Sequence, residues 1–355
     1  MMRIMNQSRI KSVIIPSKVC LAPINTGFSD NGLPTDEFYS FHSLRSSRYI
    51  GICCVGNISI SDEFASNKST LSINDKNINA FKDLTDKIKS NGSVAGIQLA
   101  CRFSNIPAMK GWASPSAYEY IKQSSEEISN MPVSKIIEIR DKFLYACELA
   151  AKAGFTHIQL HAAHGYFLSK MISNNFNKRK DEYSDTLRII KEISCGVASN
   201  FPEMILDIRI SLFEKKWFDE EDILYKKKII HELTQMPFDI ISLSNGIYNI
   251  DKHMIYPQKE LGSQQFFYWG NYFSEKYPDT FWNVAGNFDS LDDMEINYKD
   301  NLLFSVGRQL ICDPDYIEKH LAGNSTNIQY CKRCGNCHYY SNDMDNIKSC
   351  SRKAI

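Results

Sequence analysis

The sequence predicts an α/β fold, a (β/α)8 barrel with a short cysteine-rich C-terminal extension, and three observations support it. Eight short apolar runs of strand-like composition recur along the chain. Helical stretches separate several of them, which favours parallel strands joined by right-handed crossovers. A length of 355 residues suits one such barrel, and the composition changes only after about Asn324, where cysteines become frequent.

The expected elements alternate along the chain. Strands are predicted at Val19–Ala22, Ile50–Val55, Val94–Leu99, His157–His161, Met204–Ile210, Asp239–Ser244, Phe281–Ala285 and Leu302–Val306. Helices are predicted at Asn77–Ser90, Ser134–Ala153, Asp185–Ala198 and Asp219–Leu233. We therefore divide the chain into a barrel, residues 1–325, and a C-terminal segment, residues 326–355.

Composition argues against several classes of partner. Lysine plus arginine equals aspartate plus glutamate at 41 each, so no net charge attracts nucleic acid or an anionic membrane. The N-terminal residues lack the apolar core of a signal peptide, and no apolar run reaches the length of a membrane span. We expect a cytoplasmic protein that acts on a small molecule, with its 11 cysteines present as thiols or metal ligands.

The segment from Gly154 to Tyr166 is the most informative part of the chain. The imidazoles of His161 and His164 and the phenol of Tyr166 follow an apolar run where a strand should end. Functional groups in parallel α/β folds collect at the carboxyl ends of strands. The alternative is a pair of hydrogen-bonded structural histidines, but two histidines and a tyrosine within six positions favour a catalytic site.

With the loop that follows, this segment resembles the old yellow enzyme (NADH:flavin oxidoreductase) family. That family carries H-x-x-H/N-G-Y followed by a loop of the form S-P-x-x-N-x-R-x-D-x-Y. The loop positions of this chain that agree are Ser173, Asn177, Arg179, Asp181 and Tyr183. Asn174 stands where the family usually has proline. The resemblance implies a barrel that binds FMN.

The resemblance also implies flavin contacts at the other strand ends. The matching residues are Ala22, Pro23, Ile24 and Asn25 beside the ring, Gln98 at the pyrimidine, Arg209 at the N1/C2 edge, and Ala285, Gly286, Asn287, Gly307 and Arg308 near the phosphate. Arg209 is notable by itself, because a guanidinium in an apolar strand needs an anion or several acceptors. Asp207 or Asp239 is the alternative, structural partner.

Two segments depart from the family pattern. After Gln98 the family commonly continues W-H-A-G-R, whereas this chain reads Ala-Cys-Arg-Phe-Ser over residues 100–104, which predicts a different substrate pocket. The segment Ala113–Ala117 looks like the family's A-P-S segment displaced by one residue. Asp313–Asp315, by contrast, agrees with the family.

The tail contains the spacing Cys-x2-Cys-x2-Cys-x12-Cys, formed by Cys331, Cys334, Cys337 and Cys350. Three thiolates in one tight turn suit a four-iron four-sulfur cluster. Structural zinc more often joins two Cys-x2-Cys pairs, and free thiols would not explain the spacing. The pattern resembles the 2,4-dienoyl-CoA reductase and trimethylamine dehydrogenase branch of the family, in which such a cluster passes single electrons to FMN.

The sequence permits two sources of electrons. No G-x-G-x-x-G fingerprint occurs, so the FAD- and nucleotide-binding regions of that branch are not expected in this chain. Electrons would come from NAD(P)H binding over the flavin, or from a separate flavodoxin-, ferredoxin- or reductase-like donor protein. A homo-oligomer is compatible with either source.

The resemblance implies an ene-reductase that acts on a C=C conjugated to a carbonyl. His161 and His164 would bind the carbonyl oxygen, and Tyr166, whose phenol ordinarily has a pKa near 10, would donate the proton. An amine dehydrogenase or demethylase of the same family is one alternative, for which aromatic residues of the 265–282 region would bind a cation. A zinc-stabilised barrel without redox chemistry is an alternative of another class.

Overall fold

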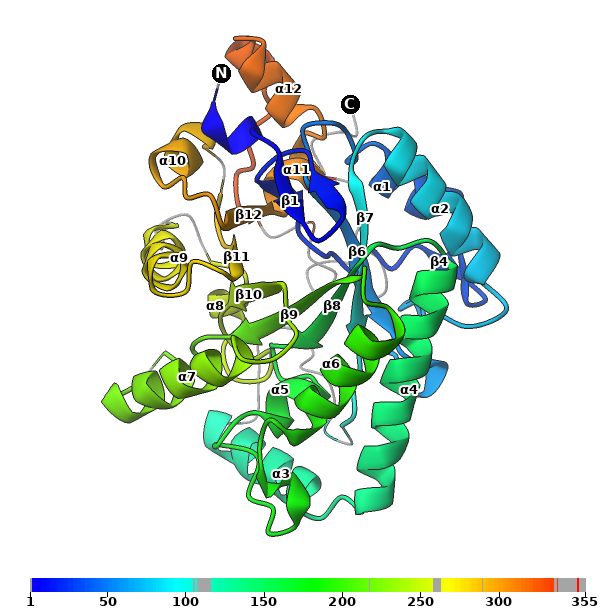
Figure 1. Ribbon diagram of the computed structural model, residues 1–355, viewed down its shortest axis with the longest axis vertical. Helices are drawn as coiled ribbons and strands as arrows, with labels where there is room; N and C mark the ends of the chain where they lie inside the picture. The colour runs from blue at the N-terminus through cyan, green and yellow to red at the C-terminus, as the bar shows by residue number, and fades with distance from the viewer. Residues whose placement is uncertain are drawn as a thin grey trace.

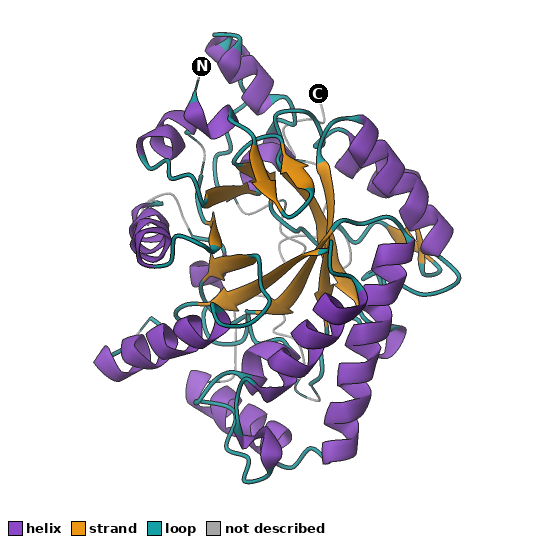
Figure 2. Cartoon of the chain, in the orientation of Figure 1, coloured by secondary structure: helices purple, strands orange, loops and turns teal. Residues whose placement is uncertain are grey.

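Eight parallel strands close into a barrel in the computed structural model (Figures 1 and 2), which describes residues 2–104, 106, 116–216, 218–257, 263–288, 290–334, 337 and 350. The barrel strands are β3 (Val19–Leu21), β6 (Ile52–Ser59), β7 (Val94–Ala100), β8 (His157–Ala162), β9 (Ile205–Ser211), β10 (Ile240–Ser244), β11 (Phe281–Ala285) and β12 (Leu302–Val306). Each strand pairs with the next one along the chain, and β12 pairs with β3. The prediction of a (β/α)8 barrel is confirmed.

Helices surround the barrel on its outer face (Figure 2). They are α1 (Asp36–Ser43), α2 (Ile78–Ser90), α3 (Ala117–Ser129), α4 (Val133–Lys152), α5 (Phe167–Met171), α6 (Arg188–Asn200), α7 (Glu220–Leu233), α8 (Lys252–Ile255), α9 (Gln264–Lys276), α10 (Leu291–Ile296), α11 (Arg308–Cys312) and α12 (Tyr316–Leu321). Among the described residues, no helix combines the length and apolar character of a membrane span. The four predicted helices are present as α2, α4, α6 and α7 with ends shifted by a few residues.

The largest difference from the expected strands is in β6. The strand was predicted to end at Val55, but it continues to Ser59, with an irregular register between Val55 and Ile58. All of its residues are buried, so the apolar run does not mark its end. The extension carries Asn57 to the carboxyl rim of the barrel.

An N-terminal hairpin that the sequence did not predict closes the opposite end. Strands β1 (Ser8–Ile10) and β2 (Val13–Ile15) pair antiparallel. Ile10 and Ile15 share a buried apolar cluster with residues near the amino ends of several barrel strands, including Ile52, Val94 and Ile240. The hairpin thereby covers the amino ends of the strands and leaves the carboxyl ends for function.

The barrel interior contains a chain of hydrogen-bonded polar side chains rather than only apolar layers. Its members, from β7 to β12, are Gln98, Gln159, Asp207, Ser242, Asn283 and Ser305. Gln159 donates to Asp207 at 2.6 Å and accepts from Gln98 at 2.6 Å. Burying these groups is tolerable because most of their polar atoms form hydrogen bonds within the barrel, although Asp207 Oδ1 has no partner among the described residues.

The aromatic run near residue 270 lies outside the barrel. Phe273 of α9 stacks on Trp282 of β11 with ring centroids 5.0 Å apart, and Trp269 stacks on Phe273 at 5.6 Å. Tyr268 is 61% exposed. These aromatic side chains pack α9 against β11, while the ring of Phe266, from the same run, lies beside Gly286 just after the end of β11.

The loop after α5 is held by Glu214, a buried carboxylate. It accepts hydrogen bonds from Ser173 at 2.7 Å and Asn175 at 2.9 Å, and it pairs with buried Lys226 of α7 at 2.7 Å. Asn177 in turn donates to two backbone carbonyl oxygens. The loop residues that carry the family resemblance therefore make structural contacts.

Replacing Glu214 by Gln should lower the free energy of unfolding by about 3–5 kcal/mol, because Lys226 would stay buried without a charge partner. The exposed pair of Glu232 and Lys228, 3.8 Å apart, provides a control. Glu232→Gln should change stability by less than about 1 kcal/mol. Urea denaturation at pH 7 measures both, and equal effects would contradict the assignment.

The same pair predicts a pH dependence. Burial by itself raises the pKa of Glu214, but Lys226 and the hydrogen bonds from Asn175 and Ser173 outweigh burial and lower it. A pKa lowered by folding contributes stability above the unfolded value, about 4.3, and that stability is lost as the pH falls through the folded value. Unfolding measured between pH 3 and pH 7 should show this acid-dependent loss in the wild type and less of it in Glu214→Gln.

Candidate active site at the carboxyl rim of the barrel

The turn after β8 places the predicted catalytic residues. His161 is near the end of β8, and His164 and Gly165 adopt left-handed backbone conformations, with φ of 63° and 85°. The backbone N–H of His164 donates to Ser211 Oγ at 3.0 Å, and its carbonyl accepts from Tyr248 at 3.2 Å. The turn is therefore fixed to β9 and to the loop after β10.

The structure brings the two histidines and the tyrosine together. The ring centroids of His161 lie 4.4 Å from those of Tyr166 and 5.1 Å from those of His164. The Tyr166 hydroxyl accepts a hydrogen bond from Asn57 Nδ2 at 2.7 Å and lies 2.9 Å from Ser66 Oγ. The prediction that these three side chains form one cluster agrees with this geometry.

Both imidazoles are held in the neutral form. Burial lowers the pKa of His161 well below its ordinary value, and the charge of Arg209 lowers it further. Burial also lowers the pKa of His164, and the neighbouring His161 and Arg209 lower it further. Neutral imidazoles can donate an N–H to a carbonyl oxygen without adding a second positive charge beside Arg209.

Arg209 of β9 is buried with donors left over. Its Nη2 donates to Ser244 Oγ at 3.1 Å, while its buried Nε has no partner. Neither structural partner considered from the sequence accepts from it: Asp207 accepts from Gln159 and Ser242, and Asp239 pairs with Lys11. A buried guanidinium with an unused N–H fits a ligand that presents an acceptor.

Residues predicted at the flavin ring converge on Gly56. A side chain there would bring its Cβ 2.8 Å from the Cβ of Gln98 and 3.2 Å from that of Pro23, so glycine is required for their approach. Ile24 forms a bridge with Gly56. The amide of Asn25 donates to Thr70 Oγ1 in the loop after β6, at 2.9 Å, and accepts from the backbone N–H of Gly27 in its own loop, at 3.2 Å.

The predicted phosphate residues lie on adjacent loops. Ala285 ends β11, and the ring of Phe266 leaves no room for a side chain at Gly286. Arg308 donates to Asn287 Oδ1 at 2.6 Å, which joins the last two strand ends. Burial lowers the pKa of Arg308 to about 10, so its guanidinium remains charged at neutral pH.

The segment after β3 lies close to the segment after β12. The backbone N–H of Ala22 donates to the Val306 carbonyl at 3.0 Å, and a Cβ added at Gly307 would meet only the Cβ of Ala22, at 3.8 Å. The segments that carry Ala22, Gly307 and Arg308 therefore meet at one side of the barrel.

The sequence did not single out several residues that complete the site. Asn57 and Ser66 contact the Tyr166 hydroxyl, and Ser244 lies 2.8 Å from His164 Nε2. The ring of Tyr248 is 6.0 Å from that of His164, and its hydroxyl bonds to the hydroxyl of Tyr256. Tyr248 follows a predicted strand by four positions, so examining that strand end would have found it.

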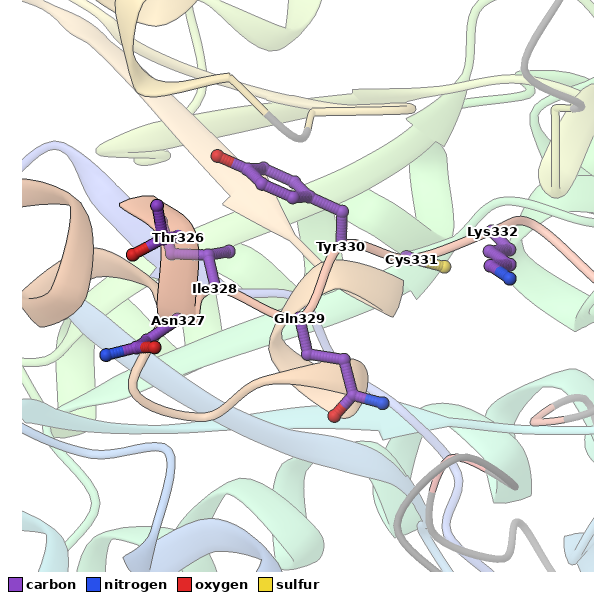
Figure 3. A pocket seen from close by; sticks show the side chains of 7 residues that line it. All are labelled: Thr326, Asn327, Ile328, Gln329, Tyr330, Cys331 and Lys332. Atoms are coloured by element: carbon purple, nitrogen blue, oxygen red, sulfur yellow. The ribbon is translucent and has the colours of Figure 1, made fainter. Parts of the chain in front are cut away.

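The cysteine segment is attached to the barrel through α11. The backbone N–H of Cys331 donates to Gln309 Oε1 at 2.9 Å, and Gln309 Nε2 donates to the Gln329 carbonyl at 3.0 Å. Residues 326–332 line an open pocket of about 740 Å3, and the Cys331 thiol extends from the same stretch of chain (Figure 3). Gln329 and Cys331 thus lie against the helix that carries Arg308.

The four cysteines lie close enough to interact electrostatically. The pKa of Cys337 is raised to about 11, mainly by burial. Cys331 raises it further, and Cys334 and Cys350 do so more weakly. Within the described parts of the chain, however, no three His, Cys, Asp or Glu side chains are arranged as a metal site. The displaced family segment predicted at residues 113–115 lies outside the described residues, and Ser116 beyond it caps α3.

Comparison with known proteins identifies the family. The sequence matches the NADH:flavin oxidoreductase / NADH oxidase family over residues 8–327. The NADPH dehydrogenase of Bacillus velezensis is 28% identical over 236 residues, which cover 60% of this chain and 69% of the relative.

Solved structures share the fold. The 2-naphthoyl-CoA reductase complex with 2-naphthoyl-CoA superposes with a TM-score of 0.80 at 16% identity, over 98% of this chain and 56% of that chain. The 6-hydroxypseudooxynicotine amine oxidase of Pseudomonas geniculata N1 superposes with a TM-score of 0.79 at 17% identity, over 98% of this chain and 53% of that chain. The old yellow enzyme homologue of Zymomonas mobilis superposes with a TM-score of 0.67 at 17% identity, over 90% of this chain and 92% of that chain. The chain thus spans about half the length of the first two proteins.

The barrel, the rim site and these comparisons define an FMN-dependent oxidoreductase. The chain belongs to the NADH:flavin oxidoreductase / NADH oxidase family, as the resemblance to old yellow enzymes predicted. Membership of a redox family also removes the alternative of a barrel without redox chemistry.

Replacing Arg209 by Met should separate a ligand-binding arginine from a structural one. We expect FMN affinity to fall by about 10- to 100-fold, the effect of a lost hydrogen bond to a charged group. The apoprotein should keep its melting temperature, because the substitution removes an incompletely bonded buried charge. Flavin fluorescence titration and thermal unfolding measure the two effects.

Arg45 is the matched control, since its buried guanidinium donates to three backbone carbonyls at 2.8–3.2 Å. Arg45→Met should lower the melting temperature of the apoprotein, because those carbonyls would be left without donors. If Arg209→Met instead destabilised the apoprotein equally and left FMN affinity unchanged, Arg209 would be structural.

Proposed function

We propose that the protein is an FMN-dependent ene-reductase, which reduces a C=C conjugated to a carbonyl. The observation that carries this proposal is the Tyr166 hydroxyl, which accepts from Asn57 and lies beside two buried, neutral imidazoles. Such a cluster can bind a carbonyl oxygen and deliver a proton to a neighbouring carbon.

The residues at the rim fit FMN. Arg209 Nε and His161 Nδ1 are buried without partners, and the space beside Gly307 is open, since an added Cβ would meet only the Cβ of Ala22 at 3.8 Å. Ala22, Pro23, Ile24 and Gln98 would border the ring, and Asn287, Gly307 and Arg308 the phosphate. Bound FMN would supply a hydride from N5 to the β-carbon of the substrate.

The remaining steps belong to side chains of the protein. Neutral His161 and His164 would donate N–H groups to the carbonyl oxygen and stabilise the negative charge that develops there. Arg209 donates to Ser244 Oγ, whose own proton is then available to His164 Nε2, so that the His164 N–H lies at Nδ1. Tyr166 would protonate the α-carbon, and the C=C would gain one hydride and one proton.

We also propose that Cys331, Cys334, Cys337 and Cys350 bind a 4Fe-4S cluster. Support comes from the spacing of the cysteines and from the electrostatic effect of the other three on Cys337. Residues 326–355 would then be a cluster-binding segment attached to the FMN barrel of residues 1–325. A cluster allows electrons to arrive singly from a donor protein, in addition to hydride from NAD(P)H.

Oxidation of amines is the second candidate function. Its support is the similarity in fold to an amine oxidase and a group of tyrosines at the site, Tyr120, Tyr166 and Tyr248, whose rings could face a cation. Anaerobic mixing separates the two candidates: an ene-reductase reoxidises its reduced flavin with enones, whereas an amine dehydrogenase reduces its oxidised flavin with amines.

Replacing Tyr166 by Phe should slow flavin reoxidation by an enone about 10²- to 10⁴-fold, because the proton donor is lost. Flavin reduction by NAD(P)H should continue, since it needs no phenol. Stopped-flow absorbance resolves the two half-reactions. Tyr39→Phe, remote from the rim with its hydroxyl on the Ala80 carbonyl, is the control. Unchanged reoxidation in Tyr166→Phe would assign the proton to water or another group.

Replacing Cys334 by Ser should abolish iron and acid-labile sulfide while leaving FMN bound. Reduction by a one-electron donor should then fall at least tenfold relative to reduction by NAD(P)H. Cys195→Ser, at an exposed position on α6, should leave the iron content intact. Stoichiometric zinc with no iron in anaerobically purified protein would disprove the cluster.

A further inference from the structure

A small cavity adjoins the Tyr166 phenol on the side of the unusual segment after Gln98. Its volume is about 40 Å3, close to that of one small polar group. Besides His164 and Tyr166, it is lined by Ser66, Arg102, Ser104 and Tyr120, among others. Arg102 and Ser104 belong to the segment that departs from the family pattern.

Arg102 is held firmly but incompletely bonded. Its backbone N–H donates to the Phe64 carbonyl at 3.0 Å, and its Nη1 donates to the Ser66 carbonyl at 3.1 Å. A longer contact of 3.5 Å joins Nη2 to the Ile106 carbonyl. Across the described ranges no carboxylate forms an ion pair with Arg102, and its side chain donates only to two backbone carbonyls, so further N–H donors are available to a ligand.

A second cation among the described residues near the cavity, Lys170, already has a charge partner. Lys170 is buried and pairs with Glu127 at 3.0 Å, and its contact with Ser104 Oγ is longer, at 3.4 Å. A ligand anion in the cavity would therefore be attracted to Arg102 rather than to Lys170. The planar guanidinium favours a carboxylate, which it can bind through two parallel hydrogen bonds.

Ser66 connects this guanidinium to the proposed chemistry. Its carbonyl oxygen accepts from Arg102, while its hydroxyl lies 2.9 Å from that of Tyr166. A carboxylate on Arg102 would consequently lie within a few bonds of the carbon that Tyr166 protonates. The volume of the cavity matches one small polar group at this end of the site.

We propose that Arg102 forms a carboxylate-binding subsite, and that the substrates are compact unsaturated ketones or aldehydes that carry a carboxylate. The proposal rests on the ene-reductase function for the carbonyl end of the substrate. The carboxylate itself is unchanged in the reaction, in which reduced FMN provides the hydride and Tyr166 the proton.

The test compares 4-oxopent-2-enoate with its methyl ester as oxidants of the anaerobically reduced holoprotein. The wild type should prefer the acid by about 10- to 100-fold in kcat/KM, the effect of one charge-assisted hydrogen bond. Arg102→Gln should remove this preference, and Arg102→Lys should restore part of it. Arg48→Gln is the control, because Arg48 bonds at the exposed surface to Tyr49. Equal rates for acid and ester in the wild type would overturn the subsite.

A binding measurement separates the subsite from the reaction. Calorimetric titration of the oxidised holoprotein with 4-oxopentanoate, which has no C=C, should show binding that Arg102→Gln weakens at least tenfold and Arg48→Gln does not change. If that dependence holds but neither unsaturated probe is reduced, ene-reduction fails and the subsite stands. If both probes are reduced and binding ignores Arg102, the subsite fails and the function stands.

Discussion

The hydroxyl of Ser244 is the contact on which the arrangement of the rim depends. It lies at the end of β10, accepts from Arg209 of β9 at 3.1 Å and lies 2.8 Å from His164 Nε2 beyond β8. Three neighbouring strands thus fix one cation and one imidazole relative to each other. Burial above all, and the charge of Arg209 in addition, lowers the pKa of both histidines, which favours the neutral state that their proposed role requires.

The polar interior of the barrel orients the groups above it. Asp207 Oδ2 accepts from the side-chain amide N–H of Gln159, whose side-chain carbonyl oxygen then faces Gln98. Gln98 therefore donates its side-chain N–H to Gln159. The side-chain carbonyl oxygen of Gln98 would then accept a hydrogen bond from the flavin. A buried carboxylate at the centre of the barrel in this way sets the polarity of a side chain proposed to contact the flavin.

One short helix connects the barrel to the cysteine segment. Arg308, at the start of α11, bonds to Asn287 near the proposed phosphate site, and the next residue, Gln309, bonds to Cys331 and Gln329. Asp313, after the helix, accepts from the Gln329 backbone at 2.9 Å. The same short helix therefore contacts both the segment before the cysteines and the proposed phosphate site.

The sequence by itself determined the eight strands, the His161, His164 and Tyr166 cluster, and the cysteine spacing, because periodicity and local motifs depend on neighbouring residues. The contacts of Asn57, Ser66 and Ser244 with that cluster, the burial that lowers the pKa of both histidines, and the cavity beside Tyr166 that Arg102 lines appear only in three dimensions. Ser66 and Tyr166 are 100 positions apart in the sequence. Asn57 lies in β6, whose end could not be predicted because every residue of the strand is buried. Contacts between distant segments and the charge states that burial imposes exist only once the barrel has closed.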